Sequence, residues 1–106
     1  MAAKPTPNYS ITVDQPNPVF GDHITFTYSP DPVAGNIVLE CSQNGVLVSS
    51  ETHAANAEGW GYHIPFTLGG TYLWTSGAAE AVARLTVPGR GRKTDTVATA
   101  SFTVGA

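Results

Sequence analysis

Short stretches in which apolar and polar residues alternate constrain the fold of this chain more than any other feature. The alternating apolar residues are Tyr9, Ile11 and Val13; Ile24, Phe26 and Tyr28; Ile37, Leu39 and Cys41; Trp60, Tyr62, Ile64 and Phe66; and Ala98, Ala100, Phe102 and Val104. A period of two places successive side chains on opposite faces of a strand, so each stretch can bury one face. Gly, Pro, Asn and Asp separate the stretches. This pattern predicts an all-β domain of about seven short strands.

The dipeptide Asn44-Gly45 is the strongest local turn signal. Asn-Gly suits the two left-handed positions of a tight hairpin turn, so we expect the stretches on either side to be antiparallel neighbours. The segment Ser76–Arg84 is harder to interpret, because it contains good helix formers but is too short for a stable isolated helix. We expect a loop that leads into a strand at Ala83–Val87, with a helical turn as the alternative.

The chain of 106 residues has room for one ordinary domain. The segment Lys4-Pro5-Thr6-Pro7 cannot be helical, so we expect residues 1–8 to form an extended N-terminal arm and residues 9–106 a single domain. The formal net charge is −3, whereas a general nucleic-acid binder is usually basic, so nucleic acid is not an expected partner.

One cysteine, Cys41, excludes an intramolecular disulfide. No apolar run approaches the roughly 20 residues of a membrane span, and the first residues lack the apolar stretch of a secretory signal. We therefore expect a chain that is made and kept in a reducing cytoplasm, without a membrane partner.

Two segments resemble immunoglobulin-like domains. Gly21–Tyr28 is similar to the second strand of such domains, with Tyr28 in the place of the first cysteine. Gly70–Trp74 is similar to the sixth strand, with Tyr72 as its corner tyrosine and Trp74 in the place of the second cysteine. The resemblance implies a two-sheet antiparallel sandwich without a disulfide, in which a Tyr28–Trp74 contact fills the space of the missing bridge. The residues expected in the structural core are Tyr28, Cys41, Tyr72, Trp74 and Phe102.

The residue types that carry chemistry do not form a recognisable catalytic or metal-binding motif. His23, His53 and His63 are far apart in sequence, and Glu51-x-His53 offers two ligands where zinc needs three or four. We expect the histidines to be exposed and Cys41 to be a buried, inert thiol. The sequence predicts no enzyme, no cofactor and no metal site.

Three groups of residues are candidates for contact with a partner. The first is Lys4, Pro5 and Pro7 of the arm, and the second is the basic cluster Arg90, Arg92 and Lys93. This cluster is either a solvated loop or an electrostatic contact with an acidic surface, because arginine can bind carboxylates with two parallel hydrogen bonds. The third is Trp60, whose flanking glycines predict an exposed aromatic ring.

Immunoglobulin-like domains of this kind occur on tailed bacteriophages, whose proteins are made and assembled in the host cytoplasm. The resemblance therefore implies a phage head decoration (minor capsid) protein that binds the capsid surface and reinforces it or displays an adhesive domain. The partner would be the major capsid protein, another virion protein or copies of the chain, and the location would be the virion. The alternative is an immunoglobulin-like module, for example on a phage tail, that binds carbohydrate or a cell surface through Trp60. A third hypothesis is an accessory domain of a longer enzyme.

Overall fold

The structure, a computed structural model, describes residues 9–29, 35–55, 65–69, 73–89, 91 and 93–106. The strands are β1 (Ser10–Val13), β2 (His23–Ile24), β3 (Phe26–Ser29), β4 (Gly35–Gln43), β5 (Val46–Ala55), β6 (Phe66–Thr67), β7 (Ala79–Pro88) and β8 (Thr94–Val104). The prediction of an all-β chain with antiparallel sheets is confirmed, and the described part contains no helix. None of these residues therefore belongs to a helix that could cross a membrane.

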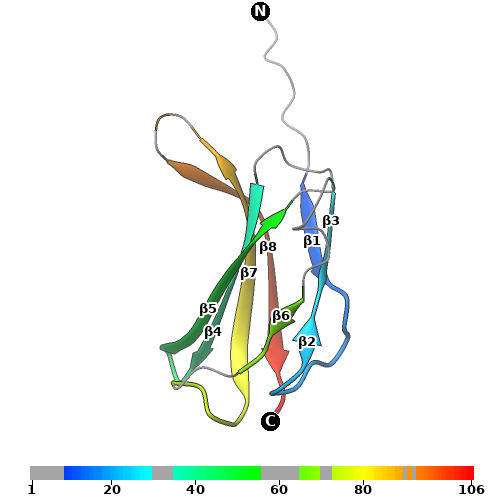
Figure 1. Ribbon diagram of the computed structural model, residues 1–106, viewed down its shortest axis with the longest axis vertical. Coiled ribbons are helices and arrows are strands. Elements are labelled where there is room, and N and C mark those ends of the chain that lie inside the picture. The colour runs from blue at the N-terminus through cyan, green and yellow to red at the C-terminus, as the bar shows by residue number, and fades with distance from the viewer. Residues whose placement is uncertain (1–8, 30–34, 56–64, 70–72, 90, 92) are drawn as a thin grey trace, which may run out of the picture.

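The strands form two layers (Figure 1). One layer is a four-stranded sheet in the order β5-β4-β7-β8. The other contains the pairs β1-β3 and β2-β6. Because only Thr25 separates β2 from β3, these two pairs follow one another along the same stretch of chain. Val19 adds a parallel bridge to Gly105, which ties the segment after β1 to the end of β8.

The β4–β5 hairpin is confirmed as predicted. Asn44 and Gly45 have φ angles of 52° and 80°, the left-handed conformation that both positions of this turn require. The register shifts between Cys41 and Ser42, so that Val48 is an extra residue on β5. Val48 is buried, whereas the preceding Leu47 is exposed. A bulge of this kind redirects side chains next to a turn.

The expectation of a loop holds for residues 76–78 but is wrong from Ala79 on, because β7 already begins there. Ala79, Ala81, Ala83 and Leu85 alternate on its inner face and are buried. Alanine is a good helix former in isolation, but here its small side chains fill the space between two close layers. Tertiary packing therefore overrides local propensity.

The assignment of Gly70–Trp74 as the sixth strand is also wrong for its described part. Leu73 and Trp74 lie in the connection between β6 and β7. The indole nitrogen of Trp74 donates a hydrogen bond to the carbonyl oxygen of Gly77 at 3.1 Å. Its ring packs edge-on against Phe20, with the ring centroids 5.5 Å apart.

The hydrophobic core lies between the two layers. Cys41 and Trp74 are buried in it, and Tyr28 and Phe102 are partly buried against it. Tyr72, the fifth residue expected in the core, lies outside the described residues. Phe26 packs on Phe102, with ring centroids 6.1 Å apart, and also contacts β6. Phe26, Phe66 and Phe102 thus form an aromatic cluster within the core.

Candidate functional site

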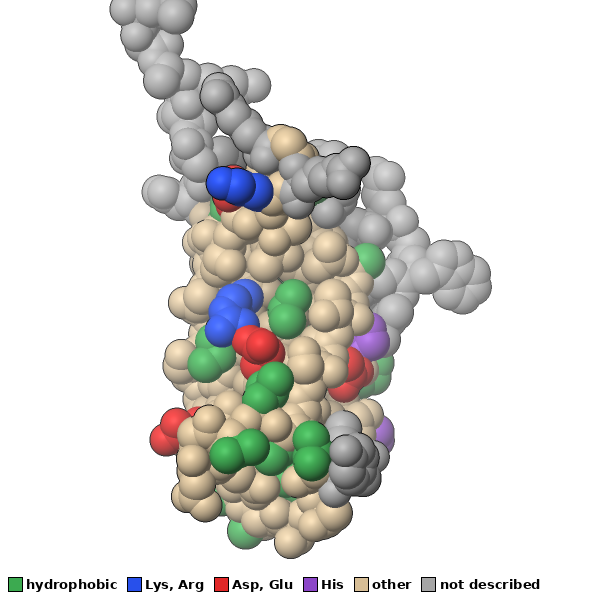
Figure 2. All heavy atoms as spheres, turned by 90° about the vertical axis from the view of Figure 1, so that its left-hand side faces the viewer, with side chains coloured by type: hydrophobic (Ala, Val, Ile, Leu, Met, Phe, Trp, Pro, Cys, Tyr) green, Lys and Arg blue, Asp and Glu red, His purple; other side chains and the backbone are tan. Residues whose placement is uncertain are grey.

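The outer face of the four-stranded sheet is mainly polar and weakly charged. The strand register places alternate residues of each strand on this face, and half of them carry hydroxyl groups: Ser42, Ser50, Thr52, Thr86, Thr96, Thr99, Ser101 and Thr103. Glu40 and Arg84 form an ion pair in its middle, flanked by Val38 and Val82. Figure 2 shows one side of the molecule, on which a few red and blue side chains lie among tan atoms and hydrophobic side chains gather toward the lower end. Such a face can lie against a flat surface without burying many unpaired charges.

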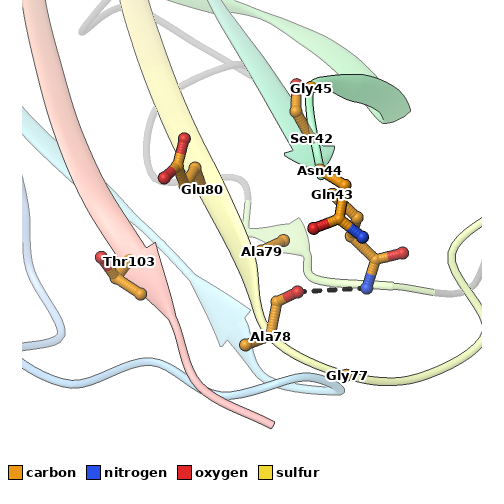
Figure 3. Close-up of a pocket in the computed structure, with 9 residues that line it drawn as sticks. All are labelled: Ser42, Gln43, Asn44, Gly45, Gly77, Ala78, Ala79, Glu80 and Thr103. Atoms are coloured by element: carbon orange, nitrogen blue, oxygen red, sulfur yellow. Dashed lines mark hydrogen bonds between the residues drawn. The ribbon is translucent and has the colours of Figure 1, made fainter.

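At one end of this face the hairpin turn, the start of β7 and the end of β8 enclose a hollow of about 540 Å³ (Figure 3). The side chains around it are Ser42, Gln43, Asn44, Ala78, Glu80 and Thr103. The Gln43 amide donates hydrogen bonds to the carbonyl oxygens of Ser76 at 2.9 Å and Ala78 at 3.1 Å. These bonds hold the β4–β5 hairpin against the segment before β7. The hairpin turn, the start of β7 and the end of β8 therefore surround the hollow in a defined arrangement.

The hollow continues along the outer face of the sheet. A second depression of about 300 Å³ shares Glu80 and Thr103 with it and extends past Val82 and Ser101. The result is a shallow groove over β7 and β8. Hydroxyl, amide and carboxylate groups line the hollow itself, and these groups can accept or donate hydrogen bonds to polar or cationic groups of a ligand.

Two large apolar side chains are exposed beside the hollow. Val46 is 61% exposed and Leu47 is 46% exposed, and they directly follow the Asn44-Gly45 turn. Leu47 lies opposite Ser42 in the ladder and Val46 lies opposite Gln43, and both partners line the hollow. Because successive side chains of a strand face opposite ways, Leu47 lies on the outer face of the sheet and Val46 on the other side of the hairpin end. We call Val46, Leu47 and the six side chains around the hollow the hairpin-end surface. Apolar side chains next to convergent polar groups are typical of a protein-binding surface.

The residues considered for metal binding or catalysis instead connect strands. The Nε2 atom of His53 lies 2.6 Å from Oε2 of Glu51, and the ring of His53 packs on Phe66 with centroids 4.3 Å apart. Oε1 of Glu51 accepts a hydrogen bond from the backbone nitrogen of Thr67 at 3.2 Å. Glu51 and His53 thus link β5 to β6 across the open edge between the layers. His53 is half-buried, which corrects the expectation that it is exposed.

His23 is exposed, and its Nδ1 atom lies 3.1 Å from Oγ1 of Thr67. Among the residues that the structure describes, no group of three or more His, Cys, Asp and Glu side chains could hold a metal ion. The thiol of Cys41 is buried. Desolvation, with the negative charge of Glu51 as a smaller cause, raises its pKa to about 11. Cys41 is therefore a neutral thiol rather than a nucleophilic thiolate at physiological pH.

The sequence-predicted contact residues lie away from the hairpin-end surface or outside the described residues. Lys93 is exposed in the connection between β7 and β8. This connection lies at the end of β7 opposite the hollow, and the nine residue steps from Ala79 to Pro88 span about 30 Å. Outside the described residues lie Lys4, Pro5, Pro7, Trp60, His63, Arg90 and Arg92.

Sequence reasoning missed the hairpin-end surface. Val46 and Leu47 were interpreted only as part of a strand, and Glu80 only as part of a loop. One available signal was the pair of large apolar residues directly after Asn44-Gly45, because a turn of this kind lies at the surface.

Comparison with known proteins finds no family model, no curated protein and no solved structure that matches this chain.

Proposed function

We propose that this chain is a non-catalytic attachment protein with an immunoglobulin-like fold, and that the hairpin-end surface binds its macromolecular partner. The exposure of Val46 and Leu47 beside the hollow is the observation that carries this proposal. Their side chains are about half exposed, so burying the remainder contributes roughly 1 kcal/mol each. An isolated contact of this strength is weak, but it becomes effective when several contacts act together.

The strand order supports the immunoglobulin-like assignment. The pairs β1-β3 and β2-β6 oppose the sheet β5-β4-β7-β8, and each connection from β3 to β7 is either a hairpin or a crossing between layers. The bridge between Val19 and Gly105 links the first segment of one layer to the last strand of the other. Related sandwiches share this architecture without sequence similarity.

A macromolecule is a better partner for the hairpin-end surface than a small molecule. Small-molecule sites enclose most of their ligand in a concave and largely apolar cavity. Here the hollow is an open depression, and polar groups make up most of its lining. A protein surface can cover the depression and Leu47 at the same time, can reach Val46 around the end of the hairpin, and can place a cationic side chain near Glu80.

The specific form that we propose is a phage head decoration protein, with the major capsid protein or another virion protein as its partner. The fold has no disulfide, and its single thiol is buried, which suits assembly in a reducing cytoplasm. A capsid offers many identical copies of one surface, so a modest contact can be repeated. The weakly charged outer sheet face can lie against neighbouring subunits without strong repulsion.

Co-sedimentation of the purified chain with undecorated capsids tests the proposal. We expect the wild-type chain to sediment with the capsids and the double variant Val46→Ser/Leu47→Ser to lose most of its binding. Leu73→Ser is the matched control, because Leu73 is 56% exposed and does not line the hollow. Wild-type protein that stays in the supernatant would contradict the capsid function. Binding on a glycan array that Trp60→Ala abolishes would support the carbohydrate-binding alternative in its place.

A further inference from the structure

The hairpin between β7 and β8 extends beyond the rest of its sheet. Pairing of β4 with β7 ends at Asn36 and Thr86, whereas β7 continues to pair with β8 through Val87–Asp95 and Pro88–Thr94. We call residues 87–95 the β7–β8 arm. Figure 1 shows this hairpin turning away from the four-stranded sheet at the end opposite the C-terminus. The arm therefore lacks the third strand that supports the rest of β7.

A bulge accounts for the change of direction. Leu85 pairs with Ala98 and Thr86 pairs with Thr96, so Val97 is an extra residue on β8. Bulges bend the strand that contains them and increase its twist. An isolated two-stranded hairpin is only marginally stable in water, so the arm contributes little to the core packing.

The described contacts give the arm a defined end. The backbone nitrogen of Gly89 donates a hydrogen bond to the carbonyl oxygen of Lys93 at 2.8 Å. The carboxylate of Asp95 packs directly against Gly89, where an added Cβ atom would lie 2.8 Å from Oδ2. Gly91 has a φ angle of 67°, which favours glycine. The hydrogen bond between Gly89 and Lys93 thus closes the described end of the arm, and the side chain of Lys93 is exposed there.

The arm carries a charge opposite to that of the remaining chain. By sequence it contains Arg90, Arg92, Lys93 and Asp95, which give a formal charge of +2. The rest of the chain contains two basic and seven acidic residues, which give −5. One of those two basic residues, Arg84, is paired with Glu40. The molecule therefore has a cationic arm on an anionic body.

We propose that the β7–β8 arm binds an acidic surface on a partner protein, which deepens the proposed function and rests on it. A localised acidic patch attracts the arm and orients the incoming molecule, because opposite charges steer association. Arginine and lysine side chains match clustered carboxylates. A long polyphosphate is a poorer match, since it would extend past the arm and meet the repulsion of the −5 body. An acidic patch on a protein can be small enough to contact the arm alone, so that it does not face the negatively charged remainder of the chain.

Poly-L-glutamate serves as the probe for this proposal, with amide chemical shifts of the full-length chain as the readout. At low salt we expect the amide signals of Gly89, Gly91, Lys93 and Thr94 to shift. The affinity for poly-L-glutamate should fall by about an order of magnitude between about 20 and about 150 mM salt. The variant Arg90→Gln/Arg92→Gln/Lys93→Gln should lose this binding, and Lys4→Gln should keep it. Lys93→Glu alone should weaken it severalfold, which provides a second test with a single substitution.

Several outcomes would overturn the inference. These are shifts centred on the hairpin-end surface, unchanged binding by the triple variant, and tighter binding to a DNA duplex than to poly-L-glutamate at equal charge concentration. Capsid co-sedimentation separates the two proposals. If the wild type and the triple variant sediment equally, the arm has no role in docking and the attachment function stands. If only the triple variant fails, both proposals are supported.

Discussion

Substitution of Gly69 by alanine should destabilise the fold strongly, for two separable reasons. Gly69 is buried and has a φ angle of 96°, a conformation that costs an L-residue about 1–2 kcal/mol. A Cβ atom at this position would also overlap the ring of Phe20, with Cζ only 2.8 Å away. Phe20 packs on the buried Trp74, so its ring cannot move without disturbing the core. Overpacking of this kind costs about 1–3 kcal/mol.

Gly21 provides a matched control for the backbone contribution. Its φ angle is 94°, almost the same as that of Gly69, but a Cβ atom at Gly21 would meet nothing within 4 Å. Gly21→Ala should therefore lower the free energy of unfolding by about 1–2 kcal/mol, and Gly69→Ala by about 2–5 kcal/mol. At about 4 °C per kcal/mol, the corresponding losses in melting temperature are about 4–8 °C and about 8–20 °C.

Urea unfolding of these variants, followed by tryptophan fluorescence, measures both contributions. The Phe20→Ala background removes the ring that the added methyl group would displace. In that background Gly69→Ala should cost only the backbone penalty, so the double-mutant cycle should give a coupling of about 1–3 kcal/mol. Equal losses for Gly69→Ala and Gly21→Ala, or a coupling near zero, would refute the packing argument and leave only the backbone contribution.

Two further predictions concern the buried thiol and its acidic neighbour. The pKa of Cys41 is about 11 in the folded state and 9.0 by reference, so the fold is stabilised by the protonated thiol. The free energy of unfolding of the wild type should therefore fall as the pH rises from about 9 to about 11. Cys41→Ala lacks this fall but loses buried volume, so its difference in stability from the wild type, measured by denaturant titration, should be constant below about pH 9 and should narrow above it. Glu51→Gln removes the charge that helps to raise this pKa but keeps an acceptor for the backbone nitrogen of Thr67. It should speed thiol labelling at pH 10 under native conditions, and an unchanged labelling rate would show that burial alone controls the thiol.

The elements that could be predicted from sequence are those whose local signal agrees with their packing. Asn44-Gly45 requires two left-handed residues and has them, so the β4–β5 hairpin follows from local chemistry. The alternating apolar residues of the stretches that contain Ile24 and Ile37 were likewise expected to face the core, and Ile24 and Ile37 are buried in it. β7 was missed at its beginning because the helix propensity of Ala79–Ala83 conflicts with its position between two strands. Only the long-range ladders resolve that conflict.

The candidate site was less predictable than the fold, because it depends on register. Ser42, Glu80 and Thr103 are far apart in sequence, and each is an ordinary polar strand residue. They converge only because Ser42 pairs with Glu80 and Glu80 pairs with Thr103 across three strands. A shift of one residue in either ladder would turn these side chains to the other face. No local motif specifies such a set.

The hairpin-end surface and the β7–β8 arm lie at opposite ends of one strand, and this geometry bears on how the chain would act. β7 is paired on both sides from Glu80 to Thr86, so it separates the two ends by about 30 Å of strand. The ends also differ in chemistry, since one offers exposed apolar side chains with Glu80 and the other offers a cationic turn. A partner that matches both ends must present an apolar site and an acidic site at the same spacing. Engagement of one end then raises the effective concentration of the other, so that two weak contacts act as one stronger attachment. For the same reason, removing either end should weaken attachment by more than the loss of its own contacts.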